Sequence, residues 1–230
     1  MSDEKIGTLP ELTSDETAQA ISQAGVSFDA FRNTMPRERS RLLRKLFDLC
    51  EMHAMDLAKI VTWENGKPLL QAQQEIAYGN SFFEWFSEEA PRVYGDVIPS
   101  SYKGNRVITI KQPIGVVGLI TPWNFPNGIT GYLVRSSCTA MVTRKVGAAI
   151  AAGCTVVLKP AADTPYSALA LAELSERAGF PKGVFNVVTA DKNTKEIGLE
   201  LCENPVVKKI SFTGSVPTCN FTNELTRRQT

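Results

Sequence analysis

The sequence has a single histidine, His53, and its five cysteines include no Cys-x-x-Cys pair. Because transition-metal sites draw on clustered histidine and cysteine ligands, we expect no metal site. The N-terminus lacks the basic, apolar and small-residue order of a signal peptide, which favours a reducing compartment for the thiols. The expected location is the cytoplasm, or the mitochondrion if the true N-terminus lies upstream.

Long hydrophobic runs and an excess of one charge are also absent. The longest apolar stretch, 114–120, is far shorter than the ~20 residues of a membrane-spanning helix. The 25 basic and 24 acidic residues are interspersed and give a net charge of +1. We therefore expect neither a membrane nor a nucleic-acid partner. With 43% hydrophobic and 21% charged residues, the composition is that of a globular protein with a sizeable core.

The first 90 residues are predicted to be helical. Apolar residues recur at three- and four-residue spacing from Arg39 to Ile60, which predicts a helix with one face in the core. The segment 65–68, Asn-Gly-Lys-Pro, indicates a helix end followed by a new start. A further helix is then predicted from Leu69 to about Glu89, closed by Pro91.

In residues 91–215 the spacing of the apolar residues changes. Residues 106–111 alternate apolar and polar side chains, which predicts a half-exposed strand. Short apolar segments then alternate with helical ones, and this pattern is typical of an α/β fold: a Rossmann-like parallel sheet with helices on both faces, preceded by the helical segment. Buried strands are predicted at 115–120, 154–158, 184–188 and 206–212, with helices at 165–179 and near 194–202.

Distinctive residues follow three of the predicted strands, where parallel sheets bind ligands. They are Thr-Pro-Trp-Asn-Phe-Pro at 121–126, Lys-Pro-Ala at 159–161 and Phe-Thr-Gly-Ser at 212–215. Taken singly, a Gly-Ser after a strand is usually a turn and a Lys-Pro is usually a solvated loop. In this order and setting, the three segments resemble the cofactor site of the aldehyde dehydrogenase superfamily. The resemblance extends from about residue 6 to residue 215.

This resemblance implies an enzyme that oxidises an aldehyde with NAD or NADP. It implies cofactor contacts from Trp123, Asn124, Lys159, Pro160, Ala161, Ala162, Gly214 and Ser215. In the family's pattern Lys159 reaches the adenosine ribose, and Gly214 and Ser215 present N–H groups to the pyrophosphate at a helix start. Ala162 stands where NAD-preferring relatives often carry a glutamate. Without that carboxylate a 2′-phosphate is not repelled, so we hypothesise that NADP is tolerated or preferred.

Two residues of the first segment have a second interpretation. By resemblance, the side-chain amide of Asn124 stabilises the oxyanion that forms when a cysteine thiolate attacks the aldehyde. An asparagine beside prolines can also simply shape a loop. Trp123 lies against the cofactor in the family, although an aromatic residue here is equally compatible with a core position.

The substrate is indicated by the segment 140–145, Ala-Met-Val-Thr-Arg-Lys, which is similar to the succinate-semialdehyde dehydrogenase version of this helix. In that subfamily the residue matching Arg144 pairs with the far carboxylate of the substrate, and a guanidinium can hold a carboxylate bidentately. The segment 83–90 also resembles that subfamily. The implied reaction is oxidation of succinate semialdehyde to succinate in 4-aminobutyrate degradation, by a homo-oligomeric enzyme. The alternative is a solvated helix arginine.

The sequence departs from the family at two places. Residues 127–139 have no counterpart and are interpreted as an anomalous insertion, such as an intron fragment read in frame. Residues 216–230 do not continue the family's pattern. The nucleophilic cysteine, the general-base glutamate and the catalytic domain are not found, and no cysteine of the chain is expected to substitute. We therefore expect the chain to be inactive alone.

Two further hypotheses stay open. The chain could be a non-catalytic module that binds a dinucleotide or other subunits, because residues 106–112 resemble the arm through which these enzymes assemble. It could also belong to a dehydrogenase for another aldehyde, in which case Arg144 would not be needed for substrate discrimination.

Overall fold

The computed structural model describes residues 6–122, 138–215, 218–220 and 222. Its centre is a four-stranded parallel sheet in the order β5-β4-β3-β6. The strands are β3 (Val116–Ile120), β4 (Thr155–Lys159), β5 (Phe185–Val187) and β6 (Val207–Phe212). The predicted fold class is therefore confirmed.

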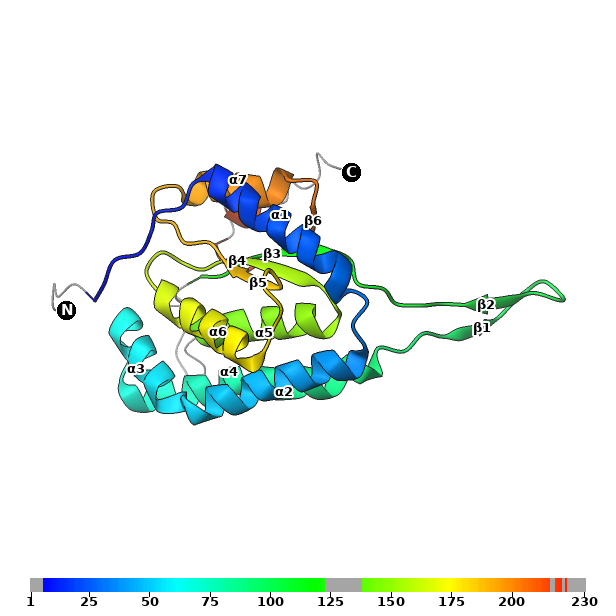
Figure 1. The fold of residues 1–230 in the computed structure, drawn as a ribbon, viewed down its shortest axis with the longest axis horizontal. Helices are drawn as coiled ribbons and strands as arrows, with labels where there is room; N and C mark the ends of the chain where they lie inside the picture. The colour runs from blue at the N-terminus through cyan, green and yellow to red at the C-terminus, as the bar shows by residue number, and fades with distance from the viewer. Residues whose placement is uncertain (1–5, 123–137, 216–217, 221, 223–230) are drawn as a thin grey trace.

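Helices cover both faces of the sheet (Figure 1). One face carries α5 (Cys138–Ala151) and α6 (Pro165–Ala178), and the other carries α1 (Ser14–Phe31) and α7 (Thr194–Glu203). A further layer of α2 (Pro36–Met52), α3 (Ala54–Asn65) and α4 (Leu69–Glu89) packs outside α5 and α6. The N-terminal helices are thus divided between the two sides of the sheet.

The layers explain why β3 and β4 are almost entirely apolar. Along β3, Val117 and Leu119 enter the larger core beneath α5 and α6, whereas Val116 enters the smaller core beneath α1 and α7. In β4, Val156 enters the larger core and Val157 enters the smaller one. A strand that is covered on both faces needs apolar residues at every position.

The predicted helical stripe from 39 to 60 is interrupted, which the sequence pattern did not indicate. His53 leaves helical geometry at φ −101° and ψ 15°, so that α2 ends before it and α3 begins after it. The next break was predicted correctly. Gly66 ends α3 at φ +69°, a left-handed conformation that glycine adopts without steric cost. A short 3-10 helix, η1 (Ala90–Arg92), closes α4.

A two-stranded antiparallel ribbon, β1 (Val97–Pro99) and β2 (Arg106–Ile108), extends away from the body of the protein (Figure 1). All six of its residues are exposed. We predicted a strand at 106–111 with one face buried. That burial is wrong, because no layer of the described residues covers either face of the ribbon. Among the described helices, none has the length and apolar character needed to cross a membrane.

Candidate dinucleotide and substrate site

The carboxyl ends of β3, β4 and β6 meet at one edge of the sheet. Thr121 donates its backbone N–H to the carbonyl of Lys159 over 3.2 Å, and Thr213 donates its N–H to the carbonyl of Ile120 over 3.1 Å. The chain winds from β3 to β4 on one side and returns to pair β6 on the other, so this edge is a topological switch point. The described parts of the three predicted segments therefore converge. Trp123 and Asn124 lie outside the described residues.

Lys159, the last residue of β4, has a nearly buried side chain at this edge, with 4% of the residue exposed. Burial lowers the pKa of its ammonium group, and the nearby carboxylates of Asp191, Glu11 and Asp163 partly oppose that shift. No ion pair among the described residues includes Lys159. A cation with three donors in such a place suits a ligand with hydroxyl or phosphate oxygens.

The loop after Lys159 is held by a residue of α3 that the sequence interpretation missed. Pro160 is buried, Ala161 and Ala162 are half-buried, and α6 begins shortly after them. The carboxylate of Glu64 accepts hydrogen bonds from the backbone N–H groups of Tyr166 and Ser167, the latter at 3.0 Å. Because this contact joins residues about a hundred positions apart, no local sequence pattern predicts it.

A second missed element is the N-terminal segment 10–12, which lies beside the end of β5. Leu12 donates its N–H to the carbonyl of Thr189 over 3.0 Å, and the hydroxyl of Thr189 donates to the carbonyl of Pro10 over 2.9 Å. The carboxylate of Glu11 accepts the N–H groups of Asp191 at 3.0 Å and Asn193 at 2.8 Å. These backbone bonds lower the pKa of Glu11.

Gly214 and Ser215 follow β6 and are exposed. Residues 218–220 are helical, and Cys219 donates its N–H to the carbonyl of Ser215 over 3.0 Å. A Cβ atom on Gly214 would lie 2.4 Å from the ring of Phe212. Glycine therefore allows the backbone to pass close to that ring.

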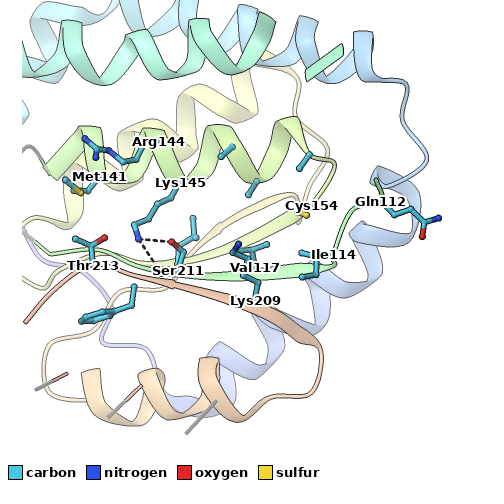
Figure 2. Close-up of a pocket in the computed structure, with 15 residues that line it drawn as sticks. Gln112, Ile114, Val117, Met141, Arg144, Lys145, Cys154, Lys209, Ser211 and Thr213 are labelled. Carbon is cyan, nitrogen blue, oxygen red and sulfur yellow. Dashed lines mark hydrogen bonds between the residues drawn. The ribbon is translucent and has the colours of Figure 1, made fainter. Parts of the chain in front are cut away.

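A groove of about 700 Å³ separates α5 from the face of β3 and β6 (Figure 2). Lys145 points from α5 to the floor of this groove, where its Nζ donates to the carbonyl and the hydroxyl of Ser211 at 3.1 and 2.9 Å. Burial, helped by the charge of Arg144, lowers the pKa of Lys145 to about 8. Lys145 is a further charged residue that the sequence interpretation did not single out.

Arg144 lies at the rim of the groove and turns toward α4 instead of the sheet (Figure 2). Its guanidinium carbon lies 4.9 Å from the ring centroid of Phe82, and its Nη2 donates to the hydroxyl of Tyr78 over 3.3 Å. No ion pair among the described residues includes Arg144. Aromatic side chains thus hold the arginine in place, and no ion pair among the described residues neutralises its charge.

Buried charged groups fix both ends of α5, the helix that carries Arg144. The carboxylate of Glu75 accepts the N–H of Thr139 at 3.1 Å and forms a buried ion pair with Lys67. At the other end, Nε of Arg39 donates to the carbonyl of Ala151 over 3.1 Å. Because α5 begins at Cys138, the last two residues of the expected insertion belong to this helix.

Burial acts on the cysteine thiols of the described core. Cys50, Cys154 and Cys202 are buried. Burial raises the pKa of Cys50 to about 12 and that of Cys202 to about 11, which suppresses the nucleophilic thiolate. Within the described residues, no group of three or more His, Cys, Asp or Glu side chains is arranged to hold a metal ion.

Comparison with known proteins decides the family. The profile described as "Aldehyde dehydrogenase family" matches residues 1–226. The chain belongs to this family. The parallel sheet, the helices on both faces and the converging strand ends are therefore those of an aldehyde dehydrogenase family domain.

Several curated relatives are similar over more than nine tenths of the chain. The glutarate-semialdehyde dehydrogenase of Pseudomonas aeruginosa is 54% identical, over 92% of this chain and 41% of its own length. The mitochondrial succinate-semialdehyde dehydrogenase of mouse is 53% identical, over 93% and 39%. The succinate-semialdehyde dehydrogenase [NADP(+)] of Escherichia coli is 52% identical, over 92% and 41%. The chain thus spans about two fifths of the length of these relatives.

Solved structures give the same picture. The crystal structure of an E. coli NADP-dependent enzyme superposes with a TM-score of 0.90 at 49% identity and covers 98% of this chain and 44% of that one. The succinate-semialdehyde dehydrogenase of Burkholderia pseudomallei superposes with a TM-score of 0.89 at 47% identity, with the same coverage.

Proposed function

We propose that residues 1–230 form the NAD(P)-binding part of an enzyme that oxidises succinate semialdehyde to succinate, as in 4-aminobutyrate degradation. The observation that carries this proposal is the meeting of three strand ends at a switch point beside the buried Lys159. The names of the mouse and E. coli relatives support the substrate. The P. aeruginosa relative is named for glutarate semialdehyde, which also pairs an aldehyde with a distant carboxylate.

The proposed cofactor contacts are Trp123, Asn124, Lys159, Pro160, Ala161, Ala162, Gly214 and Ser215. When bound, NAD or NADP accepts the hydride that leaves the substrate. Lys159 would donate hydrogen bonds to the adenosine ribose, whereas Gly214 and Ser215 would present backbone N–H groups to the pyrophosphate. Ala162 places no carboxylate against a 2′-phosphate, so NADP should bind alongside NAD. Calorimetric titration with both dinucleotides tests this, and NAD binding much tighter than NADP would contradict it.

Arg144 is the proposed contact for the far carboxylate of the substrate. Phe82 and Tyr78 fix the orientation of the guanidinium, and no described ion pair uses its charge. We expect Arg144→Met to weaken succinate binding, measured by titration of the purified chain, and Arg177→Met on α6 to leave it unchanged. If the two variants bind succinate equally well, Arg144 does not select the carboxylate and another aldehyde becomes the better hypothesis. Asn124 is the proposed oxyanion donor.

We further propose that the 230 residues have no aldehyde-oxidising activity by themselves. The chemistry requires a cysteine thiolate and a general base, and the buried thiols of Cys50 and Cys202 are held in the protonated form. Purified protein mixed with succinate semialdehyde and NADP should give no rise in absorbance at 340 nm. A reproducible rate that depends on the enzyme concentration would refute this proposal.

A subunit-interaction role is the second candidate, supported by the β1–β2 ribbon. Val97, Ile108 and Ile110 are between 67% and 75% exposed on or beside this ribbon. Exposed apolar strands favour pairing with another chain. We expect Ile108→Lys with Ile110→Lys to lower self-association in light scattering, whereas Leu70→Lys on α4 serves as an equally exposed control. Unchanged association in the ribbon variant would remove this candidate.

The expected cytoplasmic location stays a prediction. The mouse relative is named as mitochondrial, which keeps the mitochondrial alternative in view. Fractionation of cells that express the protein from its native gene distinguishes the two.

A further inference from the structure

The negative charge that Ala162 does not provide is supplied beside Lys159 by other residues. Asp191, Glu11 and Asp163 each exert an electrostatic effect on the Lys159 ammonium group. Asp163 follows Lys159 closely in the chain. Glu11 comes from the N-terminal segment, 180 residues before Asp191.

Backbone contacts connect Glu11 to the end of β4. Val188 donates its N–H to the carbonyl of Leu158 over 2.9 Å, so the loop after β5 starts beside the residue that precedes Lys159. The same loop donates the N–H groups of Asp191 and Asn193 to the Glu11 carboxylate. Glu11 is exposed, yet these bonds hold its charge in one place at this edge of the sheet.

We propose that Glu11 is a specificity-determining residue of the dinucleotide site, whose fixed carboxylate disfavours the 2′-phosphate of NADP beside Lys159. The inference rests on the proposed function, because it requires the dinucleotide to bind at this edge. Glu11 then weakens NADP binding severalfold without excluding it, so NADP still binds alongside NAD as proposed above. A fixed carboxylate repels a second anion and leaves an uncharged ribose hydroxyl almost unaffected.

The test compares Glu11→Gln with the unmodified chain by calorimetry with NAD and with NADP. Glutamine keeps an oxygen that accepts backbone N–H groups, so the loop stays anchored while the charge is removed. We expect NADP to bind about three- to tenfold tighter at low salt and NAD to change less than about twofold. The NADP effect should shrink as salt is added, since the group is exposed.

Asp29→Asn is the matched control. It removes one exposed carboxylate from the far end of α1, about 22 Å along the helix from its start. We expect it to change neither affinity. Equal changes in both variants would show a net-charge effect and overturn the assignment of specificity to Glu11.

Two other outcomes separate the inference from the proposed function. If the unmodified chain binds both dinucleotides but Glu11→Gln alters neither, or weakens both equally, Glu11 is only a loop anchor and this inference fails alone. If the unmodified chain binds neither dinucleotide, the proposed site is wrong and the inference falls with it.

Discussion

The carboxylate of Glu75 accepts the backbone N–H of Thr139 at 3.1 Å while it is paired with Lys67, and all three residues are buried. One side chain of α4 thus caps the start of α5 and neutralises a buried ammonium group. Since α5 carries Arg144 and Lys145, this contact helps to determine where both cations lie.

Loss of the Glu75 charge should destabilise the protein strongly. Glu75→Gln leaves the Lys67 ammonium buried without its carboxylate, which we expect to cost about 3 kcal/mol or more in urea unfolding. Glu173→Gln breaks the exposed pair with Arg177 and should cost less than about 1 kcal/mol. Lys67→Met added to Glu75→Gln should recover part of the loss. Equal stability of the two single variants would show that the buried pair contributes no more to the free energy of unfolding than the exposed pair does.

Lys145 should make stability rise with pH. Its pKa is about 8 in the folded protein, against an ordinary value of 10.5. Between these values the unfolded state binds more protons, so raising the pH favours the folded state. The advantage of the unmodified chain over Lys145→Met in urea midpoint should therefore grow between pH 8 and pH 10. Parallel pH profiles would indicate that Lys145 is solvated and not desolvated on the groove floor.

Cys50 should resist thiol reagents in the folded state. With a pKa of about 12, its thiolate at pH 8 is roughly a thousandfold scarcer than that of an ordinary cysteine. We expect slow reaction with a chromogenic disulfide and fast reaction in urea, with Cys50→Ala used to identify the peptide by mass spectrometry. Rapid labelling of native Cys50 would require the surrounding core of α2 to open.

Glu64 should influence the loop after Lys159 through the start of α6. Glu64→Ala removes the acceptor of two backbone N–H groups and of the Ser167 hydroxyl, which lies at 2.5 Å. Loss of such a cap typically costs about 1–2 kcal/mol. Hydrogen exchange of Tyr166 and Ser167 should accelerate, while exchange in β6 serves as the reference. Unchanged exchange at the start of α6 would show that the cap is dispensable.

Local signals in the sequence determined the order of the elements in this chain and the positions of its distinctive residues. Gly66 ended a helix where predicted, β3 and β4 appeared at the apolar segments, and Lys159 and Gly214 stood at strand ends. These features depend on turn residues and on the spacing of apolar side chains, both of which act over a few residues.

Only the tertiary structure decided which distant residues support the site. Glu11, Glu64, Glu75 and Arg39 make contacts across 64 to 182 residues, and each satisfies backbone groups at the end of another element. A charged residue has the same local pattern whether it lies in solvent or caps a remote helix. For the buried Glu75 and Arg39, packing removes the water that would otherwise bind those backbone groups, and that depends on the whole fold.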